Sequence, residues 1–303
     1  MASVPAQMKR AIGVAAVGAV LLVVAGCGSS GPASTDILFV STRDGDYALY
    51  GMSADGGGAR RLTEEAGDPS SPSGLYFQVE PDWSPDGTRI AFASKRDGHS
   101  HVFVMLADGS GTKRLTSTDG EDGQPTWSPD GRHIAFSRSD DIYVIAADGT
   151  GARRLGSDSA EERDPAWSPD GRWIAYVRRT PGTTSRDVWL VRPDGSGRRR
   201  LTTLNAASFS PAWSPDGGRI VFSTDAEGGA YDLYVIRRNG EGLRRLTSSE
   251  ADAFEPAWSP DGTRIAFSRD GSIFTIGPAG GSEDQLTDGG NDSEPAWRPP
   301  TLE

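Results

Sequence analysis

The sequence predicts an all-β fold: a six-bladed β-propeller of four-stranded antiparallel blades, closed by pairing of the C-terminal strand with the N-terminal blade. Three observations lead to this prediction. The phrase EPAWSPDGTRIAF at 255–267 has four close copies earlier, and a sixth copy, EPAW at 294–297, stops after four residues. Tryptophans mark the copies about every 40–45 residues, which is the length of one propeller blade. Glycine and proline number 39 and 20 among 303 residues, as expected of many short strands joined by tight turns.

The first element, residues 1–26, is expected to be a lipoprotein signal peptide. Lys9 and Arg10 precede an apolar run from Ala11 to Gly26, which is shorter than the roughly 20 residues that span a bilayer. The segment VVAGC that ends at Cys27 resembles a bacterial lipobox. The resemblance implies cleavage before Cys27 and a diacylglyceryl group on its thiol. An uncleaved anchor with an incidental cysteine is the alternative, and either Met1 or Met8 fits as the start.

Residues 27–36 are expected to form a flexible tether. The run GSSGPASTD that follows Cys27 is rich in glycine, serine and proline and has no apolar pattern. Such a segment has an average reach of about 15–20 Å, enough to hold a domain just off a membrane surface. Two acyl chains on the new amino terminus would supply the double signal that stable anchoring takes.

The repeat at 164–202 shows how one blade is built. DPAW is a short strand, SPDG is a turn, and RWIAYVRR and DVWLVRP are the second and third strands. The turn DGSG then leads into a fourth strand, RRRLT. Both faces of the central strands are apolar, which indicates sheets that are covered on both sides, as blades are by their neighbours.

The repeated tryptophan is interpreted as an inter-blade packing residue, because it recurs in every unit whereas a binding site is usually local. A sugar-stacking platform is the alternative. The residues concerned are Trp83, Trp127, Trp167, Trp213, Trp258 and Trp297.

The two ends of the repeat region complement each other. The segment 37–63 has no first strand before it, and EPAW at 294–297 has no second strand after it. If 294–297 supplies the missing strand, residues 37–297 close into a ring without an open edge, and 298–303 remain as a C-terminal tail.

The full pattern, PxWSPDGxxIAFxS followed by LYV and RRLT segments, resembles the WD40-like repeats called PD40 in TolB-type propellers. The likeness covers residues 37–297. It implies a six-bladed propeller that binds other proteins, and it transfers no catalytic residue to this chain.

Composition excludes several classes of function. A net charge of −11 disfavours nucleic acid as a partner. Cys27 is the single cysteine, so an intrachain disulfide is impossible. The sequence has no Gly-x-Ser-x-Gly nucleophile elbow. His99 and His101 are expected to be a solvated pair at a loop edge, and His133 a solvated residue beside a turn.

Other charged residues are given structural interpretations. The aspartates of the SPDG turns, such as Asp86, are expected to bond their own backbone. The basic pairs before LT, such as Arg199 and Arg200, are expected to protect the outer edges of the blades, with an anionic-ligand stripe as the alternative.

One set of residues is a candidate site: the residue before the proline of each first strand. These ring residues are Glu80, Gln124, Asp164, Ser210, Glu255 and Glu294. We expect them to encircle one mouth of the central channel, where converging carboxylates would raise some pKa values and attract a cation, with Ca²⁺ possible, or a basic peptide. The alternative is that each acid accepts hydrogen bonds from backbone amides at the blade junction.

The insertion at 64–79 contains LYF, which is either an exposed contact patch or folded against the first blades. The expected function is that of an exported, monomeric, non-enzymatic lipoprotein on the extracytoplasmic side of a cell membrane, held there by its lipid alone. It binds a protein or peptide at the cell envelope and needs no cofactor or metal. The alternatives are a channel-centred metal-dependent lyase or lactonase-like hydrolase, and a glycan-binding propeller. For the last, the sequence shows no aromatic platform beyond the structural tryptophans.

Overall fold

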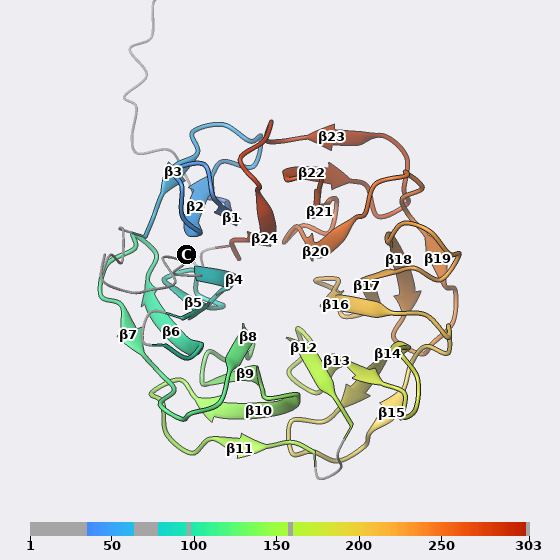
Figure 1. Cartoon of the computed structure of the whole chain (residues 1–303), viewed down its shortest axis with the longest axis horizontal. Helices are drawn as coiled ribbons and strands as arrows, with labels where there is room; N and C mark the ends of the chain where they lie inside the picture. The colour runs from blue at the N-terminus through green and yellow to red at the C-terminus, as the bar shows by residue number, and fades with distance from the viewer. Residues whose placement is uncertain (1–34, 64–77, 96–97, 157–159, 301–303) are drawn as a thin grey trace, which may run out of the picture. The chain divides into compact units, whose positions relative to one another are not determined.

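The computed structural model describes residues 35–63, 78–95, 98–156 and 160–300. Six four-stranded antiparallel sheets stand around a central axis (Figure 1). The predicted six-bladed propeller is therefore confirmed. Within the described part of the chain there is no helix, and so none that could cross a membrane.

The strands of each blade are given from the axis outward. Blade 1 holds β24 (Ser293–Trp297), β1 (Ile37–Ser41), β2 (Ala48–Met52) and β3 (Arg60–Arg61). Blade 2 holds β4 (Gln78–Trp83), β5 (Arg89–Ser94), β6 (His101–Leu106) and β7 (Lys113–Arg114). Blade 3 holds β8 (Asp122–Trp127), β9 (His133–Arg138), β10 (Asp141–Ala146) and β11 (Arg153–Arg154).

Blade 4 holds β12 (Glu162–Trp167), β13 (Ile174–Arg179), β14 (Arg186–Val191) and β15 (Arg199–Arg200). Blade 5 holds β16 (Ser208–Trp213), β17 (Arg219–Thr224), β18 (Asp232–Arg237) and β19 (Arg244–Arg245). Blade 6 holds β20 (Phe254–Trp258), β21 (Ile265–Arg269), β22 (Ser272–Ile276) and β23 (Glu283–Gln285).

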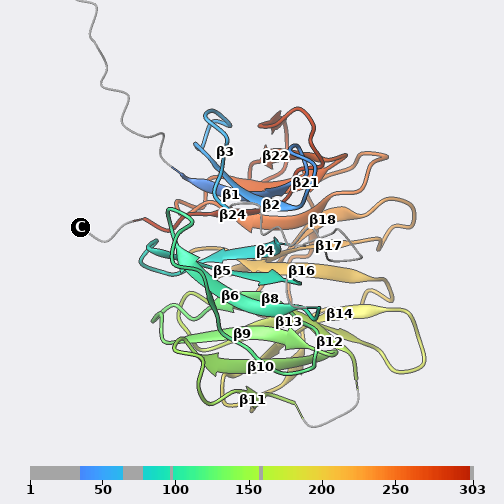
Figure 2. The ribbon, with the colours of Figure 1, turned by 60° about the vertical axis from the view of Figure 1, so that its left-hand side comes forward.

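The ring closes as the sequence predicts, through the two ends of the repeat region. Strand β24 pairs antiparallel with β1, so that Trp297 lies opposite Ile37 and Ala296 opposite Leu38 (Figure 2). The incomplete last copy of the repeat thus supplies the innermost strand of blade 1. Closure leaves no blade with an exposed inner edge.

The fold extends beyond both expected boundaries. Thr35 and Asp36, placed in the tether by sequence, belong to blade 1: Thr35 is buried against Gly51, and the Asp36 amide donates to the Met52 carbonyl at 2.9 Å. Arg298, placed in the tail, donates its amide to the Asp36 carbonyl at 2.7 Å. The Gly/Ser-rich composition hid the first of these contacts, because Thr35 fits there only where Gly51 lacks a side chain.

The apolar core lies between blades rather than inside one sheet. Leu38 and Val40 of blade 1 form one cluster with Phe92 and Met105 of blade 2. The other clusters join neighbouring blades in the same way, for example Val188 and Phe222 between blades 4 and 5. Every residue of β1 and β2 is buried, in agreement with strands covered on both faces.

The repeated tryptophans lie at these junctions, and several are covered by an arginine of the preceding blade. Arg89 lies 4.5 Å from the Trp127 ring, Arg219 4.9 Å from Trp258, and Arg264 4.8 Å from Trp297. A cation at this distance from a ring face is attracted to it. Trp83, Trp127, Trp213 and Trp258 are buried, and Trp167 and Trp297 are half-buried.

The SPDG turns are made as predicted. In the first, the Ser84 hydroxyl donates to Asp86 Oδ1 at 2.6 Å, and the Thr88 amide donates to the same oxygen at 3.0 Å. The basic pairs lie on the outer strands. There Arg199 donates to the Arg238 carbonyl of the next blade at 2.6 Å, and Arg200 forms an ion pair with Asp187. These arginines therefore connect neighbouring strands and blades, and they also place positive charge on the outer edge of the sheet.

The histidines differ in part from expectation. His99 and His133 are exposed, as predicted. His101 is not solvated: it is the first residue of β6, is buried, and has its Nε2 2.7 Å from Arg114 Nη2. Alternation along β6 turns His101 inward, where Asp122 of blade 3 lies 3.9 Å from its Nδ1.

Candidate functional site at the channel mouth

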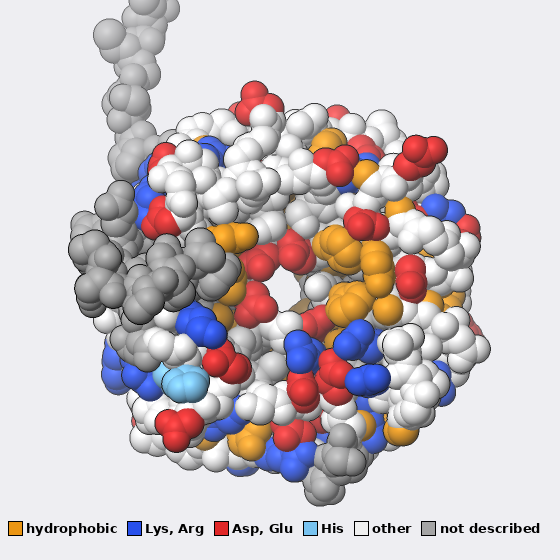
Figure 3. Space-filling view, in the orientation of Figure 1, with side chains coloured by type: hydrophobic (Ala, Val, Ile, Leu, Met, Phe, Trp, Pro, Cys, Tyr) orange, Lys and Arg blue, Asp and Glu red, His pale blue; other side chains and the backbone are white. Residues whose placement is uncertain are grey.

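The six ring residues meet at the axis of the propeller. Each lies on the innermost strand of its blade, and all six line one cavity of about 680 Å³. Figure 3 shows acidic side chains inside the opening on this face. The structure therefore brings together Glu80, Gln124, Asp164, Ser210, Glu255 and Glu294.

Backbone geometry explains why these side chains face the axis. All six ring residues have positive φ, between 49° at Ser210 and 59° at Glu80. In all six blades the strand pairing also shifts register at this point, which marks a β-bulge. Non-glycine residues in this conformation are held there by their surroundings, and such strain gathers at functional sites.

Hydrogen bonds run around the channel from blade to blade. The Gln124 amide donates to the Glu80 carboxylate at 2.5 Å, and the Ser210 amide donates to Asp164 at 2.8 Å. The Glu294 amide donates to Glu255 at 2.8 Å, and the Glu80 amide in turn donates to Glu294. The four acids of the ring thus accept hydrogen bonds from backbone amides at the blade junctions, which is the alternative to a cation-binding or peptide-binding rim.

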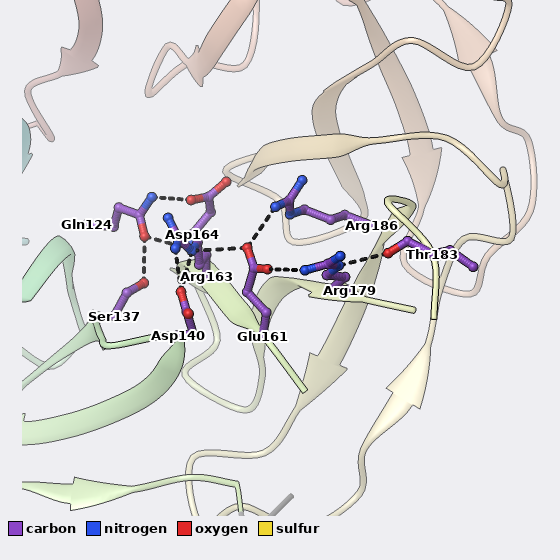
Figure 4. Close-up of polar contacts among 9 residues, drawn as sticks. All are labelled: Gln124, Ser137, Asp140, Glu161, Arg163, Asp164, Arg179, Thr183 and Arg186. Carbon is purple, nitrogen blue, oxygen red and sulfur yellow. Dashed lines mark hydrogen bonds and ion pairs between the residues drawn. The ribbon is translucent and has the colours of Figure 1, made fainter. Parts of the chain in front are cut away.

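Gln124 and Glu255 each accept hydrogen bonds from two donors, a backbone amide of the next blade and a serine of the neighbouring strand. Gln124 Oε1 accepts from the Asp164 amide at 3.1 Å and from the Ser137 hydroxyl at 2.6 Å (Figure 4). Glu255 Oε2 accepts from the Glu294 amide at 2.8 Å and from the Ser268 hydroxyl at 2.7 Å. The channel therefore repeats one arrangement, in which a side-chain oxygen accepts hydrogen bonds from a backbone amide and from a serine hydroxyl.

Burial makes the ring acids hard to ionise. It raises the pKa of Glu80 to about 7, in spite of the bond from the Gln124 amide, and the nearby Asp164 and Glu255 carboxylates add to the rise. Burial also raises the pKa of Glu294 well above its ordinary value, with Glu255 and Glu80 contributing. The channel mouth therefore retains protons near neutral pH.

The ring does not provide a metal site of ordinary form. Among the residues that the structure describes, no group of three or more acidic, histidine or cysteine side chains is placed to hold a metal ion. Four ring carboxylates accept hydrogen bonds from backbone amides instead, and Ca²⁺ at the channel mouth stays a prediction.

An aromatic platform flanks the channel, contrary to the expectation that only the tryptophans could form one. The ring centres of Phe209 and Tyr231 are 5.6 Å apart, and those of Tyr231 and Phe254 are 4.9 Å apart. All three line the cavity and are half-buried. Figure 3 shows the apolar patch over β16 and β20, on one side of the opening.

The sequence contains a pattern that indicates this platform, one residue before the ring position. The residue just before the ring residue is Phe209 in blade 5 and Phe254 in blade 6. The corresponding residues elsewhere are Val79, Gly123, Arg163 and Ser293. Two aromatic side chains at matching positions of adjacent blades indicate one shared surface.

Arginines border the platform on its blade 4 side. Arg186 donates to Glu161 at 2.7 Å, and its guanidinium lies 5.3 Å from the Phe209 ring. Arg163 donates to Asp140 at 2.8 Å (Figure 4). The chemical character of the mouth therefore changes from blade to blade. Arginines paired with acidic residues lie on the blade 4 side, and half-buried aromatic side chains lie on the side of blades 5 and 6.

Several sequence-based expectations fall outside the described residues: the signal peptide at 1–26, lipidation of Cys27, the tether up to residue 34, and the LYF segment of the 64–79 insertion. Of the six junction tryptophans, Trp258 and Trp297 also line the channel cavity.

Comparisons with known proteins agree with the geometry. The profile of the PD40 family, the TolB β-propeller domain, matches residues 70–203 and 164–301. The chain is 38% identical over 94 residues to the Tol-Pal system protein TolB of Syntrophus aciditrophicus, covering 30% of this chain and 19% of that protein. It is 32% identical over 77 residues to a TolB homologue of Chlorobium luteolum, covering 25% and 15% of the two chains. The chain thus aligns with less than a fifth of either relative's length.

Among solved structures, TolB from Acinetobacter baumannii superimposes with a TM-score of 0.75. The match covers 89% of this chain and 68% of that one at 21% identity, and it shows a shared fold. Because the family profile spans well over half of the sequence and the repeats close into six blades, the chain belongs to the TolB β-propeller domain family.

Proposed function

We propose that the protein is an exported, lipid-anchored propeller that binds a protein or peptide partner at the cell envelope through its channel mouth, as a monomer and without catalysis. The observation that carries this proposal is the composition of the mouth. A cavity of about 680 Å³ combines half-buried polar groups with a half-buried aromatic platform, as recognition sites do. Family membership supports a binding role, since the relatives named above are TolB proteins.

The ring acids favour recognition over acid–base chemistry. The Glu80, Asp164, Glu255 and Glu294 carboxylates each accept a backbone amide of the next blade. A catalytic acid or base must instead reach the proton that it transfers. Carboxylates used in this way fix the shape of the channel.

The proposal is tested by capturing partners from native membranes with the wild-type protein and with a Tyr231→Ala/Phe254→Ala variant. Captured proteins are identified by mass spectrometry. Loss of one specific protein with the double variant is expected. Leu106→Ala serves as the control, because Leu106 is an exposed apolar residue that does not line the cavity. Equal capture by all three proteins would contradict the proposal.

Glycan binding is the second candidate, and the aromatic platform is the observation in its favour. Sugar rings stack on aromatic faces of this kind, and the platform lies open to the cavity. Binding of soluble N-acetylglucosamine oligomers that is lost with the same double variant would favour this function over the first.

A further inference from the structure

The propeller has a second face, opposite the channel mouth. Tyr231, in the loop between the second and third strands of blade 5, lines the mouth cavity, so these loops mark the mouth face. Because consecutive strands of a blade run antiparallel, the other turns lie on the opposite face, here termed the turn face. Its turns are 168–173 and 192–198 in blade 4, and 214–218 and 238–243 in blade 5.

The described chain enters the propeller on the turn face. The Asp36 carboxylate accepts from the Ala54 amide, in the turn 53–59 of blade 1, at 3.1 Å. The Asp36 carbonyl accepts from the amide of Arg298, whose guanidinium bonds Gly87 in the turn 84–88 of blade 2. The predicted tether is therefore connected to the fold beside these turns and away from the mouth.

Positive charge gathers on the turn face of blades 4 and 5, where these blades depart from the repeat. In each blade two residues precede the Asp-Gly pair, or its counterpart, in the turn between the third and fourth strands. They read SA (53–54), LA (106–107), AA (146–147), RP (192–193), RR (237–238) and GP (277–278) in blades 1 to 6. Arginine occurs there in two neighbouring blades and in no other, so the repeated fold does not require it.

A tryptophan lies among these arginines. Blade 4 has Trp173 at the position where blades 2, 5 and 6 have the arginine that covers a tryptophan of the following blade. The Trp173 ring is half-buried, and the guanidinium carbons of Arg192 and Arg199 lie 5.6 Å and 5.4 Å from its centre. Because cations are attracted to an aromatic ring, Trp173 holds both arginines at the surface of blade 4.

The positive charge of this cluster is not neutralised by ion pairs. Among the described residues, Arg172, Arg192 and Arg199 form no ion pair with a carboxylate, and Arg172 and Arg192 are exposed. Burial lowers the pKa of Arg199, and the charge of Arg238 adds to this effect, so the two guanidinium groups repel each other.

Two aspartates border the cluster. Asp170 pairs with Arg238 at 3.1 Å. Hydrogen bonds from Ser196 lower the pKa of Asp194, and the charge of Arg192 adds to this effect. Four arginines beside two aspartates leave a local positive charge on a chain whose net charge is −11.

We propose that the turn face of blades 4 and 5 docks on the anionic phospholipid surface of the membrane that holds the lipid anchor. Arg172, Arg192 and Arg199 contact lipid phosphates, which guanidinium groups bind through charge-assisted hydrogen bonds. Leu243, which is 40% exposed, and the exposed part of Trp173 lie at the level of the headgroups, where tryptophan is favoured. This inference rests on the lipid anchor of the proposed function, and it directs the channel mouth away from the membrane, toward the partner.

The position of the tether favours a lipid surface over an acidic protein as the occupant. A segment of this kind reaches about 15–20 Å on average, so an anchor at Cys27 keeps the face that the segment joins close to the bilayer. Charges separated by more than about 8–10 Å are largely screened at physiological salt, so the lipid responds to the nearby arginines more than to the acids of the opposite face. The arginines therefore select the face that approaches the membrane.

The test uses the full-length protein, purified from membranes and reconstituted in vesicles. Ser196→Cys, on the turn face of blade 4, and Thr184→Cys, on its mouth face, each add one exposed thiol for an NBD fluorophore that brightens in contact with lipid. Label at position 196 is expected to brighten when phosphatidylcholine vesicles are replaced by vesicles of phosphatidylcholine and phosphatidylglycerol in equal parts. Label at position 184 is expected to stay unchanged. Salt at about 1 M, which shortens the Debye length to about 3 Å, is expected to remove the response.

Two double variants show whether the arginines cause the response. Arg172→Gln/Arg192→Gln is expected to reduce the ratio of docked to undocked protein about tenfold or more, because each arginine near an anionic surface contributes to binding. Lys95→Gln/Arg179→Gln is the matched control. It removes two exposed positive charges from the mouth face and is expected to leave the response unchanged.

Wild-type protein, without an added thiol, separates this inference from the anchor on which it rests. Labelling of Cys27 in the wild type would refute the anchor, and with it the tethered docking. If Cys27 takes no label, equal responses at positions 196 and 184, or an equal loss in both double variants, would refute the docking alone. A response at position 196 that needs native membranes and is absent with pure lipid vesicles would assign the arginines to an acidic protein and overturn the inference.

Discussion

The guanidinium of Arg298 lies 4.9 Å from the centre of the Trp83 ring and donates to the Gly87 carbonyl at 2.8 Å. Arg89, Arg219 and Arg264 cover the tryptophan of the following blade in the same way, but each of them stands at the start of a second strand or just before it. Blade 1 has no such arginine, because the corresponding residue, just before Ile37, is Asp36. Arg298 fills the missing position from the other end of the chain.

Replacing Arg298 by alanine should therefore destabilise the propeller. The loss of one cation–π contact and one hydrogen bond is expected to lower the free energy of unfolding by about 1–2 kcal/mol in urea denaturation. Arg237→Ala is the control. That arginine is exposed, and its one ion pair among the described residues, with the exposed Glu241 at 3.9 Å, is of a kind that contributes little to stability. If the two variants unfold at the same urea concentration, Arg298 has no role in ring closure.

Ser210→Gln should stabilise the folded protein. In blade 3 the Gln124 side-chain oxygen accepts from the Ser137 hydroxyl and from the Asp164 amide. Ser223 of blade 5 has the register of Ser137, is fully buried, and has no hydrogen-bond partner among the described residues. A glutamine at position 210 would supply the missing acceptor, and a buried donor that gains its partner recovers about 1–3 kcal/mol. Thermal unfolding measures the effect, and Ser210→Ala, which supplies no acceptor, should show no gain. A melting temperature of the Gln variant at or below that of the Ala variant would mean that the donors are satisfied in another way.

Stability should fall as pH rises through the window set by Glu80. Its pKa is raised from 4.5 to about 7, so between these values the folded protein binds more protons than the unfolded chain. The resulting penalty grows from pH 4.5 upward and is complete above pH 7, where it amounts to roughly 3 kcal/mol at most. Glu80→Gln removes it while keeping an acceptor for the Gln124 amide.

Between pH 5 and pH 8 the free energy of unfolding of wild type should therefore fall relative to that of Glu80→Gln. Denaturation at several pH values gives this difference directly. Glu241→Gln, at an exposed glutamate, should run parallel to wild type. A parallel profile for Glu80→Gln as well would show that Glu80 ionises normally in the channel.

Cys27→Ser should release the protein from the membrane. If the lipobox resemblance reflects function, the serine variant carries no lipid and moves to the soluble or uncleaved fraction. Fractionation of cells that express each form measures this. Unchanged sedimentation with membranes would contradict the lipid anchor.

Repetition made the architecture predictable, and departures from repetition were harder to see. The offset between 37–63 and 294–297 predicted ring closure, because a missing strand at one end matched a surplus strand at the other. The role of Arg298 was missed, since its partner Trp83 is more than 200 positions away in sequence and the local RPP pattern resembles a tail.

The candidate site was predictable in position but not in detail. Counting back from the proline located Glu80 and its counterparts. The orphaned Ser223 depends on a comparison between blades 3, 5 and 6 that requires the strand register. His101 was misplaced for a related reason: alternation along β6 decides which histidine of the pair faces inward, and the strand's first residue is not evident from sequence.

The central claim is that the channel mouth, on its blade 5 and blade 6 side, is where a partner binds. Photo-cross-linking in native membranes tests it most directly, with a photoreactive phenylalanine analogue in place of Phe254 in one protein and of Leu106 in another. The account predicts one discrete cross-linked product from position 254 and none from position 106. Identical products from both positions, or a product from 106 alone, would contradict it.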